Sequence, residues 1–350
     1  MKKSTLSIVA LFSVVLLVFS TFSCAKKDSS DKSASSKAKN PKVTITNVSY
    51  DPTRELYANY NKLFIPHWKE VSGQDVEITQ SHGGSGKQAL EVANGLEADV
   101  VTLALEYDVN AVKNAGLIEP GWVSEFPLDS SPYTSTIVFL VRKGNPKKIY
   151  DWDDLIRSDV GIITPNPKTS GGACWNYLAA WAYGQRKFNN DEEKVKDFIK
   201  KIYANVLVLD SGARGATISF VQNKQGDVLL AWENEAFLSI ADYPDDYEIV
   251  TPSLSILAQP SVAIVDEVVD RRGTREVATE YLNYLYSEEA QRLAGQNFYR
   301  PSNSKVLAEF SGVFDLNINL VTINDFGGWD AAHEKHFKNG GLFDQIYDKK

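Results

Sequence analysis

This chain of 350 residues is poor in cysteine and histidine, and its charge is not basic. It contains two cysteines and four histidines, and 37 Lys and Arg residues stand against 45 Asp and Glu residues, for a formal net charge of −8. With so few cysteines the chain is not a small domain held together by disulfide bonds. The acidic balance argues against a broad nucleic-acid-binding face. The hydrophobic fraction of 43% and the length instead predict a globular protein with two domains.

Long hydrophobic runs are also missing, except near the N-terminus. Two lysines at positions 2 and 3 precede the apolar run Ile8–Phe19, which is too short for a convincing membrane span. Small residues follow, and the tetrad Thr21-Phe22-Ser23-Cys24 resembles a bacterial lipobox, although Phe22 and Thr21 depart from its usual residues. We therefore predict a signal peptide over residues 1–23 and a lipid on Cys24; plain secretion is the alternative.

Residues 24–41 are small and polar and show no hydrophobic period. This composition predicts a disordered tether between the lipid and a globular body outside the cytoplasm, in the periplasm. If Cys24 carries a lipid, Cys174 has no partner for an internal disulfide. Since no histidine is near Cys174 in the sequence, we interpret it as a small residue in the first turn of a helix and not as a nucleophile.

The most informative stretch runs from residue 160 to residue 184. A short apolar strand over 160–163 leads into a loop with two prolines, and apolar residues at helical spacing follow Ser170-Gly171-Gly172. Ser170 suits the N-cap of that helix, and the two glycines leave their N–H groups open to a ligand. Such a helix start favours an anion site, although a simple capped helix has the same sequence.

Several other predicted strands end in similar loops. The expected pattern is a strand, a Gly-, Ser- or Asp-containing loop and then a helix, with strands over 43–50, 76–80, 98–105, 135–141, 206–209, 227–231 and 261–265 and one of the helices over 217–222. This alternation predicts an α/β fold whose sheets are mostly parallel and whose ligand lies at the carboxyl ends of the strands. We predict one lobe over 42–134 plus 259–350 and a second over 135–258, with the ligand in the cleft between them.

Two catalytic motifs come close to matching and fail. A phosphate-binding P-loop requires Gly at position 81 and Ser or Thr at position 88, where this chain has Ser81 and Gln88. The G-x-S-x-G nucleophile motif fails because Lys87 occupies its last glycine position. Ser85 therefore remains only as a hydroxyl at a glycine-rich helix start.

The groups at these strand ends are neutral hydrogen-bond donors: backbone N–H groups, serine hydroxyls and a tryptophan indole. Sulfate is fully deprotonated at neutral pH and only accepts hydrogen bonds, whereas phosphate carries a proton that requires an acceptor. A site made only of donors therefore selects a fully deprotonated oxyanion such as sulfate.

Several segments together resemble the bacterial sulfate- and thiosulfate-binding proteins of ABC importers, from about Val43 to the C-terminus. The matching motifs are 47–57 (NVSYDPTRELY), 80–88 (QSHGGSGKQ), 98–105 (ADVVTLAL), 132–147 (PYTSTIVFLVRKGNPK), 164–172 (TPNPKTSGG), 209–215 (LDSGARG) and 231–236 (AWENEA). The resemblance implies a two-lobed periplasmic-binding-protein fold of type II that closes on a dehydrated dianion. The ligand donors it implies are Asp51, Ser85, Ser170, Gly171, Gly172, Ala213 and Trp232.

The resemblance also implies a partner, the membrane permease of an ABC importer. We further expect a monomer that binds no cofactor and no nucleic acid. Two features depart from the family pattern, namely the lipid anchor and Cys174, which stands where relatives often have arginine. His82 and Arg214 are candidates for residues that support the ligand-binding groups from behind.

Two alternative functions are a receptor that prefers thiosulfate and an enzyme, namely an extracytoplasmic hydrolase. A hydrolase needs a metal cluster or an activated nucleophile. His333 and His336 form H-x-x-H and not H-E-x-x-H, which favours a helix face over a metal site. We therefore expect a binding protein without enzymatic activity or a bound metal.

Overall fold

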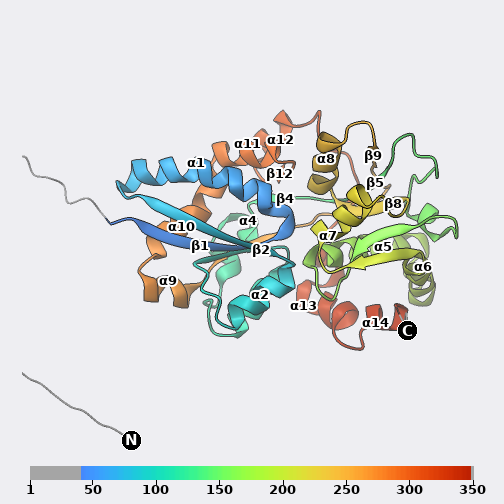
Figure 1. The fold of residues 1–350 in the computed structure, drawn as a ribbon. Helices are drawn as coiled ribbons and strands as arrows, with labels where there is room; N and C mark the ends of the chain where they lie inside the picture. The colour runs from blue at the N-terminus through green and yellow to red at the C-terminus, as the bar shows by residue number, and fades with distance from the viewer. Residues whose placement is uncertain (1–40, 348–350) are drawn as a thin grey trace, which may run out of the picture. The chain divides into compact units, whose positions relative to one another are not determined.

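The computed structural model describes residues 41–347, and strands alternate with helices along most of this range (Figure 1). The predicted signal peptide and Cys24 lie outside the described residues, as does nearly all of the tether. Among the described residues, no helix has both the length and the apolar character that a membrane span requires.

Two sheets form the core of the two lobes. The strands of the first sheet, in spatial order, are β11 (Ser261–Ile264), β3 (Val100–Leu103), β1 (Val43–Tyr50) and β2 (Val76–Gly83). Those of the second are β7 (Val206–Asp210), β6 (Ile162–Pro165), β8 (Val228–Trp232), β5 (Ile137–Arg142) and β9 (Tyr247–Val250).

Each sheet has one strand that runs against the others. In the first sheet β1 is parallel to β2 and β3, and β11 is antiparallel to β3. In the second, β6 is parallel to β7 and β8, while β5 is antiparallel to both of its neighbours, β8 and β9. The α/β fold with mostly parallel sheets is therefore confirmed.

The helices surround these sheets, and shorter elements complete the chain. The helices are α1 (Arg54–Ser72), α2 (Ser85–Ala93), α3 (Glu106–Asn114), α4 (Pro127–Ser130), α5 (Gly171–Lys187), α6 (Glu192–Ala204), α7 (Ala213–Thr217), α8 (Glu233–Asp242), α9 (Asp266–Arg272), α10 (Arg275–Asn283), α11 (Glu288–Gln296), α12 (Ser304–Glu309), α13 (Trp329–Ala332) and α14 (Leu342–Ile346). Short 3-10 or π turns are η1 (Asp51–Thr53), η2 (Trp122–Ser124), η3 (Trp152–Ile156), η4 (Ile218–Gln222), η5 (Tyr284–Tyr286), η6 (Ile323–Phe326) and η7 (His333–Phe337). Two-stranded pairs join β4 (Tyr133–Thr134) to β12 (Arg300–Pro301) and β10 (Ser255–Ile256) to β13 (Leu320–Val321).

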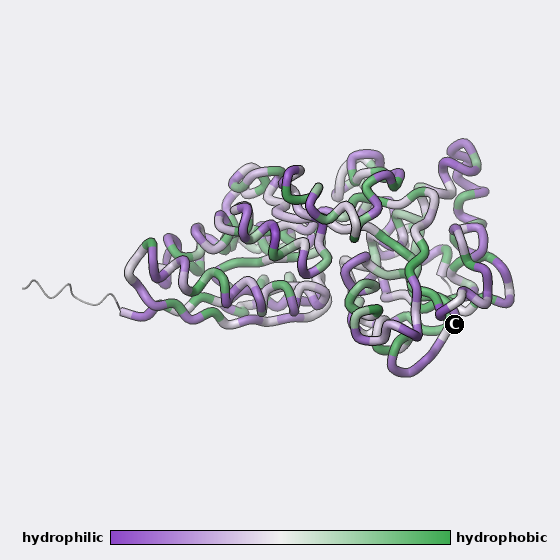
Figure 2. The backbone as a smooth tube through the Cα atoms, turned by 90° about the horizontal axis from the view of Figure 1, so that it is seen from above, coloured by the Kyte–Doolittle hydropathy of each residue, from purple (hydrophilic) through white to green (hydrophobic). Residues whose placement is uncertain are grey.

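The apolar pattern of the sequence explains this arrangement. Strands β3, β5 and β11 are buried along almost their whole length, as expected for strands covered on both faces. Helix α1 instead buries one stripe, which contains Leu56, Tyr60, Phe64 and Trp68. In Figure 2 the strands are accordingly mainly hydrophobic, whereas the helices alternate between hydrophobic and hydrophilic residues.

Two of the chain segments that run between the sheets lie next to each other, one before β5 and one before β11. They are bonded to each other, because the N–H of Ser135 donates to the carbonyl of Ala258 and the N–H of Ala258 donates to the carbonyl of Ser135, both at 2.9 Å. The Thr136 hydroxyl adds bonds to the Ser255 hydroxyl and to the Ile256 carbonyl. The two connections are therefore held together by backbone and side-chain hydrogen bonds.

The C-terminal segment packs differently from the prediction that assigned all of 259–350 to the first lobe. Strand β13 pairs with β10, the imidazole of His336 lies 3.2 Å from the Tyr177 hydroxyl of α5, and Trp329 packs edge-to-face on Trp175 of α5. We propose that residues 320–347 belong to the second lobe. The other predicted lobe boundaries stay as proposed.

Candidate functional site

A small cavity lies where strand ends of the two sheets face each other. It is lined by Tyr50, Asp51, Pro52, Gly83, Gly84 and Ser85 of the first lobe and by Ser170, Gly172 and Ala213 of the second. Five of the seven predicted ligand donors thus meet in one place, although they come from four separate stretches of the sequence.

Each of these stretches begins a helix directly after a strand. Asp51 opens η1 after β1, Ser85 opens α2 after β2, Gly171 opens α5 after β6, and Ala213 opens α7 after β7. The first N–H groups of a helix have no carbonyl one turn earlier to bond, and they carry the positive end of the helix dipole. The cavity therefore collects uncharged donors with a positive partial charge.

The start of α5 has the geometry expected from its sequence. The hydroxyl oxygen of Ser170 accepts the N–H of Ala173 at 3.4 Å, as an N-cap residue does, while the Ser170 N–H donates to the Asn166 carbonyl at 2.9 Å. A Cβ on Gly171 would lie 2.9 Å from Leu105 Cγ and 3.0 Å from a carboxylate oxygen of Asp108. Glycine at position 171 is thus required for the first lobe to approach this closely.

The start of α7 corrects the predicted helix over 217–222. The structure begins the helix at Ala213, and the π turn η4 continues it to Gln222. The sequence predicted a loop here because glycines, present at positions 212 and 215, disfavour a helix. In the structure, a Cβ on Gly215 would lie 3.3 Å from the Asp210 side chain, so this glycine permits close packing inside a helix. The earlier start places the Ala213 N–H at the head of α7.

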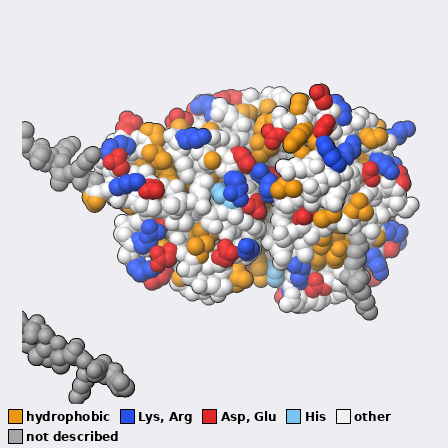
Figure 3. Space-filling view, in the orientation of Figure 1, with side chains coloured by type: hydrophobic (Ala, Val, Ile, Leu, Met, Phe, Trp, Pro, Cys, Tyr) orange, Lys and Arg blue, Asp and Glu red, His pale blue; other side chains and the backbone are white. Residues whose placement is uncertain are grey.

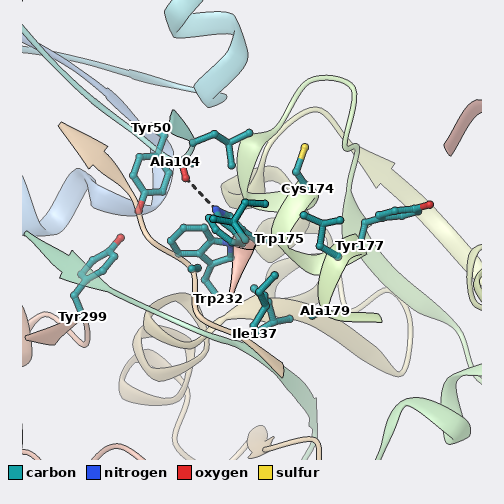
Figure 4. Close-up of a cluster of buried hydrophobic side chains, with 14 of the residues drawn as sticks. Tyr50, Ala104, Ile137, Cys174, Trp175, Tyr177, Ala179, Trp232 and Tyr299 are labelled. Atoms are coloured by element: carbon teal, nitrogen blue, oxygen red, sulfur yellow. Dashed lines mark hydrogen bonds between the residues drawn. The ribbon is translucent and has the colours of Figure 1, made fainter. Parts of the chain in front are cut away.

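Trp232 lies just behind the cavity and is buried. Its indole Nε1 donates to the Gly172 carbonyl at 3.1 Å, and a Cβ on Gly172 would lie 3.2 Å from the same nitrogen. The ring packs at 5.5 Å on Tyr50, which itself lines the cavity, and Figure 4 shows Trp232 between Tyr50 and Trp175. Trp232 and Gly171 are thus adjacent to the described cavity wall without forming part of it.

Ser85 is oriented by Asp108, a residue that sequence reasoning missed. The Ser85 hydroxyl donates to a carboxylate oxygen of Asp108 at 2.5 Å and accepts the Ala104 N–H at 3.0 Å. Burial raises the pKa of Asp108 to about 6, and the hydrogen bond from Ser85 limits the increase. The signal in the sequence is an acidic residue, Asp108, five positions after the end of β3 at Leu103.

Among the described residues, the predicted supporting residue His82 makes no hydrogen bond with Ser85. Its Nε2 lies 3.2 Å from the Gln80 side-chain oxygen, and burial, together with the charge of Arg54, lowers its pKa. The hydrogen bonds of Ser85 thus assign its orientation to Asp108 and not to His82.

Arg214 is neutralised by two carboxylates. It donates to both oxygens of Glu55 at 2.9 and 2.8 Å and to Glu235 at 3.0 Å, and the Thr217 hydroxyl donates to the other oxygen of Glu235. Burial alone would lower the pKa of Arg214, but these hydrogen bonds and charges raise it. Figure 3 shows side chains of both charges at this junction of the two lobes. Because Glu55 belongs to α1 and Arg214 to α7, the ion pair also joins the lobes.

His333, His336 and Cys174, the residues considered for metal binding or covalent chemistry, instead make packing or hydrogen-bond contacts inside the fold. His333 stacks on Tyr107 with ring centres 3.8 Å apart, and His336 is buried beside Tyr177. Cys174 is buried, its thiol donates to the Pro167 carbonyl at 3.3 Å, and burial raises its pKa well above the ordinary value. Within residues 41–347 there is no group of three His, Cys, Asp or Glu side chains that could hold a metal ion.

Comparisons with known proteins agree with this geometry. A model of the bacterial extracellular solute-binding protein family matches residues 54–300. The chain is 58% identical to a sulfate-binding protein of Escherichia coli over 87% of this chain and 93% of that protein, and 45% identical to a thiosulfate-binding protein of Pseudomonas aeruginosa over 87% and 92%. The solved structure of the sulfate-binding protein SubI from Mycobacterium tuberculosis superposes with a TM-score of 0.75 at 32% identity, covering 83% of this chain and 98% of SubI. These similarities extend over most of the chain, which therefore belongs to the bacterial extracellular solute-binding proteins, in the group that contains the sulfate- and thiosulfate-binding proteins.

Proposed function

We propose that this protein is an extracytoplasmic receptor that captures sulfate in the cleft between its lobes and delivers it to the permease of an ABC importer. The observation that carries this proposal is the convergence of helix starts from both lobes on one small cavity. We infer sulfate as the ligand from the sulfate-binding relatives, which are 58% identical over 87% of this chain.

The proposed contacts are all neutral donors. They are the N–H groups of Asp51, Ser170, Gly171, Gly172 and Ala213, the hydroxyls of Ser85 and Ser170, and the indole N–H of Trp232. These contacts, as hydrogen bonds to a charged ligand at ~1.5–3 kcal/mol each, give a gross stabilisation of ~12–24 kcal/mol. Lost freedom and desolvation remove several kcal/mol, which leaves micromolar or tighter affinity.

Some of these donors have protein acceptors that sulfate would replace. The Trp232 indole would exchange the Gly172 carbonyl for a ligand oxygen, and the Ser170 N–H would exchange the Asn166 carbonyl. Such exchanges cost little net energy, because one hydrogen bond replaces another of similar type and the new acceptor is charged.

Cations have no direct role in the proposed contacts. Arg214 is held by Glu55 and Glu235, and Lys168 donates to Asp344 and to two backbone carbonyls. A receptor must release its ligand to the permease, and a sulfate paired directly with a buried arginine would be hard to release.

Thiosulfate is the second candidate ligand, because thiosulfate-binding relatives are 45% and 43% identical over most of the chain. Thiosulfate differs from sulfate by one sulfur in place of one oxygen, and the proposed donors suit both anions. We further propose that residues 1–23 are removed on export, that Cys24 anchors the protein to a membrane by a lipid, and that the protein acts as a monomer without enzymatic activity.

Calorimetric titration tests the proposed function. The ligand-stripped mature protein is titrated separately with sulfate, thiosulfate, phosphate and molybdate. We expect tight binding of sulfate, of thiosulfate or of both, and no response to phosphate, whose proton would find no acceptor. Absence of binding by both sulfur oxyanions would refute the proposal.

The Trp232→Phe variant keeps an aromatic ring at this buried position but removes the indole N–H. One hydrogen bond to a charged ligand is worth ~1.5–3 kcal/mol, so sulfate affinity should fall about 10- to 100-fold. Titration of this variant measures the loss, and the melting temperature without sulfate serves as the stability control. An unchanged affinity would remove Trp232 from the proposed set of contacts.

Ionic strength provides a separate test of the neutral donor set. Surface charges lose most of their attraction beyond a Debye length of about 8 Å at physiological salt, whereas short hydrogen bonds do not. We therefore expect sulfate affinity to change less than about threefold between low salt and 0.5 M NaCl. A steep loss of affinity with salt would indicate direct contacts with lysine or arginine side chains.

A further inference from the structure

We propose that Trp175 holds the two lobes together around the ligand, through a hydrogen bond from its indole N–H to the carbonyl of Ala104. The bond exists when the lobes meet, so it slows the release of the bound anion. This inference rests on the proposed function and adds a residue that does not contact the anion. Trp175 is a positioning residue, since it acts on the ligand through the donors that it holds in place.

The bond crosses from one lobe to the other. Trp175 belongs to helix α5 of the second lobe, and Ala104 directly follows strand β3 of the first. The indole Nε1 donates to the Ala104 carbonyl at 3.0 Å, and both residues are fully buried. Figure 4 shows this bond as the dashed line between the two residues. A buried bond of this length is well formed, so it stabilises the arrangement in which the lobes meet.

The sequence of α5 places Trp175 against the first lobe. Residues four apart lie on the same face of a helix, so Trp175 shares its face with Gly171. A Cβ on Gly171 would lie 2.9 Å from Leu105 Cγ and 3.0 Å from Ala104 Cβ, so the first turn of α5 rests directly on this end of β3. Glycine at position 171 lets the helix approach, and Trp175 one turn later reaches the Ala104 carbonyl.

Both ends of the bond lead to proposed ligand contacts. The Ala104 N–H donates to the Ser85 hydroxyl oxygen at 3.0 Å, so the residue that accepts the bond from Trp175 also orients Ser85. At the other end, Trp175 lies on the helix that begins with Gly171 and Gly172. The bond therefore fixes a donor of the first lobe relative to donors of the second.

The C-terminal segment holds the indole ring in this orientation. Trp329 of α13 is buried and packs edge-to-face on Trp175, with ring centres 4.6 Å apart and an angle of 87° between the rings. Aromatic pairs favour this arrangement. Residues 320–347 thus contribute to the closure of the lobes through Trp175, although the residues that line the ligand cavity come from other segments.

The bond favours the closed protein over the open one. When the lobes separate, α5 leaves the end of β3, and the indole N–H and the Ala104 carbonyl each bond to water. The bond therefore adds to the stability of the closed protein alone. Since release of the anion requires opening, loss of the bond should act mainly on the dissociation rate, as most changes in affinity between related complexes do.

The first test compares sulfate binding by the wild-type protein and by Trp175→Phe, which keeps an aromatic ring and loses the indole N–H. Stopped-flow fluorescence measures association and dissociation, and calorimetry measures affinity. Loss of one buried hydrogen bond, with its acceptor left unpaired, should speed the dissociation of sulfate about 5- to 30-fold. The association rate should stay within about twofold of the wild-type value, so the affinity falls by nearly the same factor as the dissociation rate rises.

Trp152→Phe is the matched control. Trp152 is fully buried, and its indole N–H donates to the Leu254 carbonyl at 2.8 Å, but both residues belong to the second lobe. The same substitution therefore removes the same kind of bond within one lobe. Trp152→Phe should lower the melting temperature and leave the dissociation rate within about twofold of the wild-type value. Equal acceleration in both variants would indicate a general loosening of the second lobe and overturn the proposal.

Hydrogen exchange of the indole protons gives a readout that a purely structural role would not change. In NMR spectra of the isotope-labelled wild-type protein, each indole resonance is assigned by its absence from the spectrum of the matching variant. The Trp175 proton should exchange at least about tenfold more slowly with sulfate than without it, because its bond opens with the cleft. The Trp152 proton should exchange slowly in both states.

Equally slow exchange of the Trp175 proton with and without sulfate would overturn the role of Trp175 while leaving the proposed function intact. This measurement needs only the wild-type protein to fold. An unchanged dissociation rate in folded Trp175→Phe would overturn the role as well. Failure of the wild-type protein to bind sulfate would instead refute the proposed function and this inference with it.

Discussion

Gly84→Val should lower sulfate affinity by roughly 5- to 150-fold, the equivalent of ~1–3 kcal/mol, while leaving each lobe folded. A Cβ on Gly84 would lie 2.7 Å from the Thr169 carbonyl oxygen and 3.4 Å from that of Ser211, and both of these residues belong to the second lobe. A contact this short with backbone forces the lobes apart, and overpacking of this kind costs ~1–3 kcal/mol or more. The backbone of Gly84 is extended, with φ −61° and ψ 135°, so valine fits the first lobe itself.

The measurement is sulfate titration of Gly84→Val beside Gly312→Val, whose added side chain begins in open space. The control should bind as the wild-type protein does. Both variants should melt close to the wild-type temperature without sulfate, because the clash of Gly84→Val exists only when the lobes are closed. A Gly84→Val affinity within threefold of wild type would show that closure to the observed distance is not needed for binding.

Arg300→Met should destabilise the protein by about 3–5 kcal/mol, the usual cost of removing one partner of a buried ion pair. Arg300 and Glu233 are both almost fully buried, and the guanidinium donates to the two carboxylate oxygens at 2.7 and 2.9 Å and to the Asp315 carbonyl at 2.9 Å. Methionine fills much of the same volume but leaves Glu233 buried without its cation. Since Glu233 follows Trp232 directly, part of the damage should reach the ligand site.

The destabilisation should also depend on pH. Burial raises the pKa of Glu233 above its ordinary value, and Arg300 opposes this increase. Without Arg300 the folded-state pKa is raised further above the unfolded value, so the folded state binds the extra proton and stability falls as the pH rises. Urea unfolding of Arg300→Met should therefore show a smaller loss at pH 5 than at pH 8.

Arg292→Met provides the comparison for this experiment. Its ion pairs with Glu288 and Glu309 are exposed, and pairs of this kind contribute little to stability because solvent screens them. Equal losses in Arg292→Met and Arg300→Met would contradict the importance given to the buried pair.

The sequence predicts those parts of the site that depend only on residues close together in the chain. Ser170 followed by two glycines predicts a helix start with a hydroxyl cap, and the structure confirms the cap and the start of α5 at Gly171. Such features depend on a few neighbouring residues, since capping and backbone freedom are local properties. The order of strands and helices was predictable for the same reason.

The parts that could not be predicted depend on contacts between distant segments. Asp108 meets Ser85 across 23 positions of the chain, and nothing in the sequence around it shows that its carboxyl is buried. Glycine at 215 looked like a loop residue because its close neighbour, the Asp210 side chain, is known only from the fold. The lobe of the C-terminal segment was hard to predict because its short helices show little periodicity, and its aromatic contacts with α5 support the proposal that it belongs to the second lobe.

The most direct test of the central claim is a crystal structure with selenate, a tetrahedral dianion that replaces sulfate and scatters anomalously. We expect one selenium peak in the cavity between Asp51, Ser85, Gly172 and Ala213, with every ligand oxygen bonded to N–H or O–H donors and no direct ion pair. A peak paired with Arg214 or Lys168, or a peak outside this cavity, would contradict the claim that neutral donors at helix starts hold the anion.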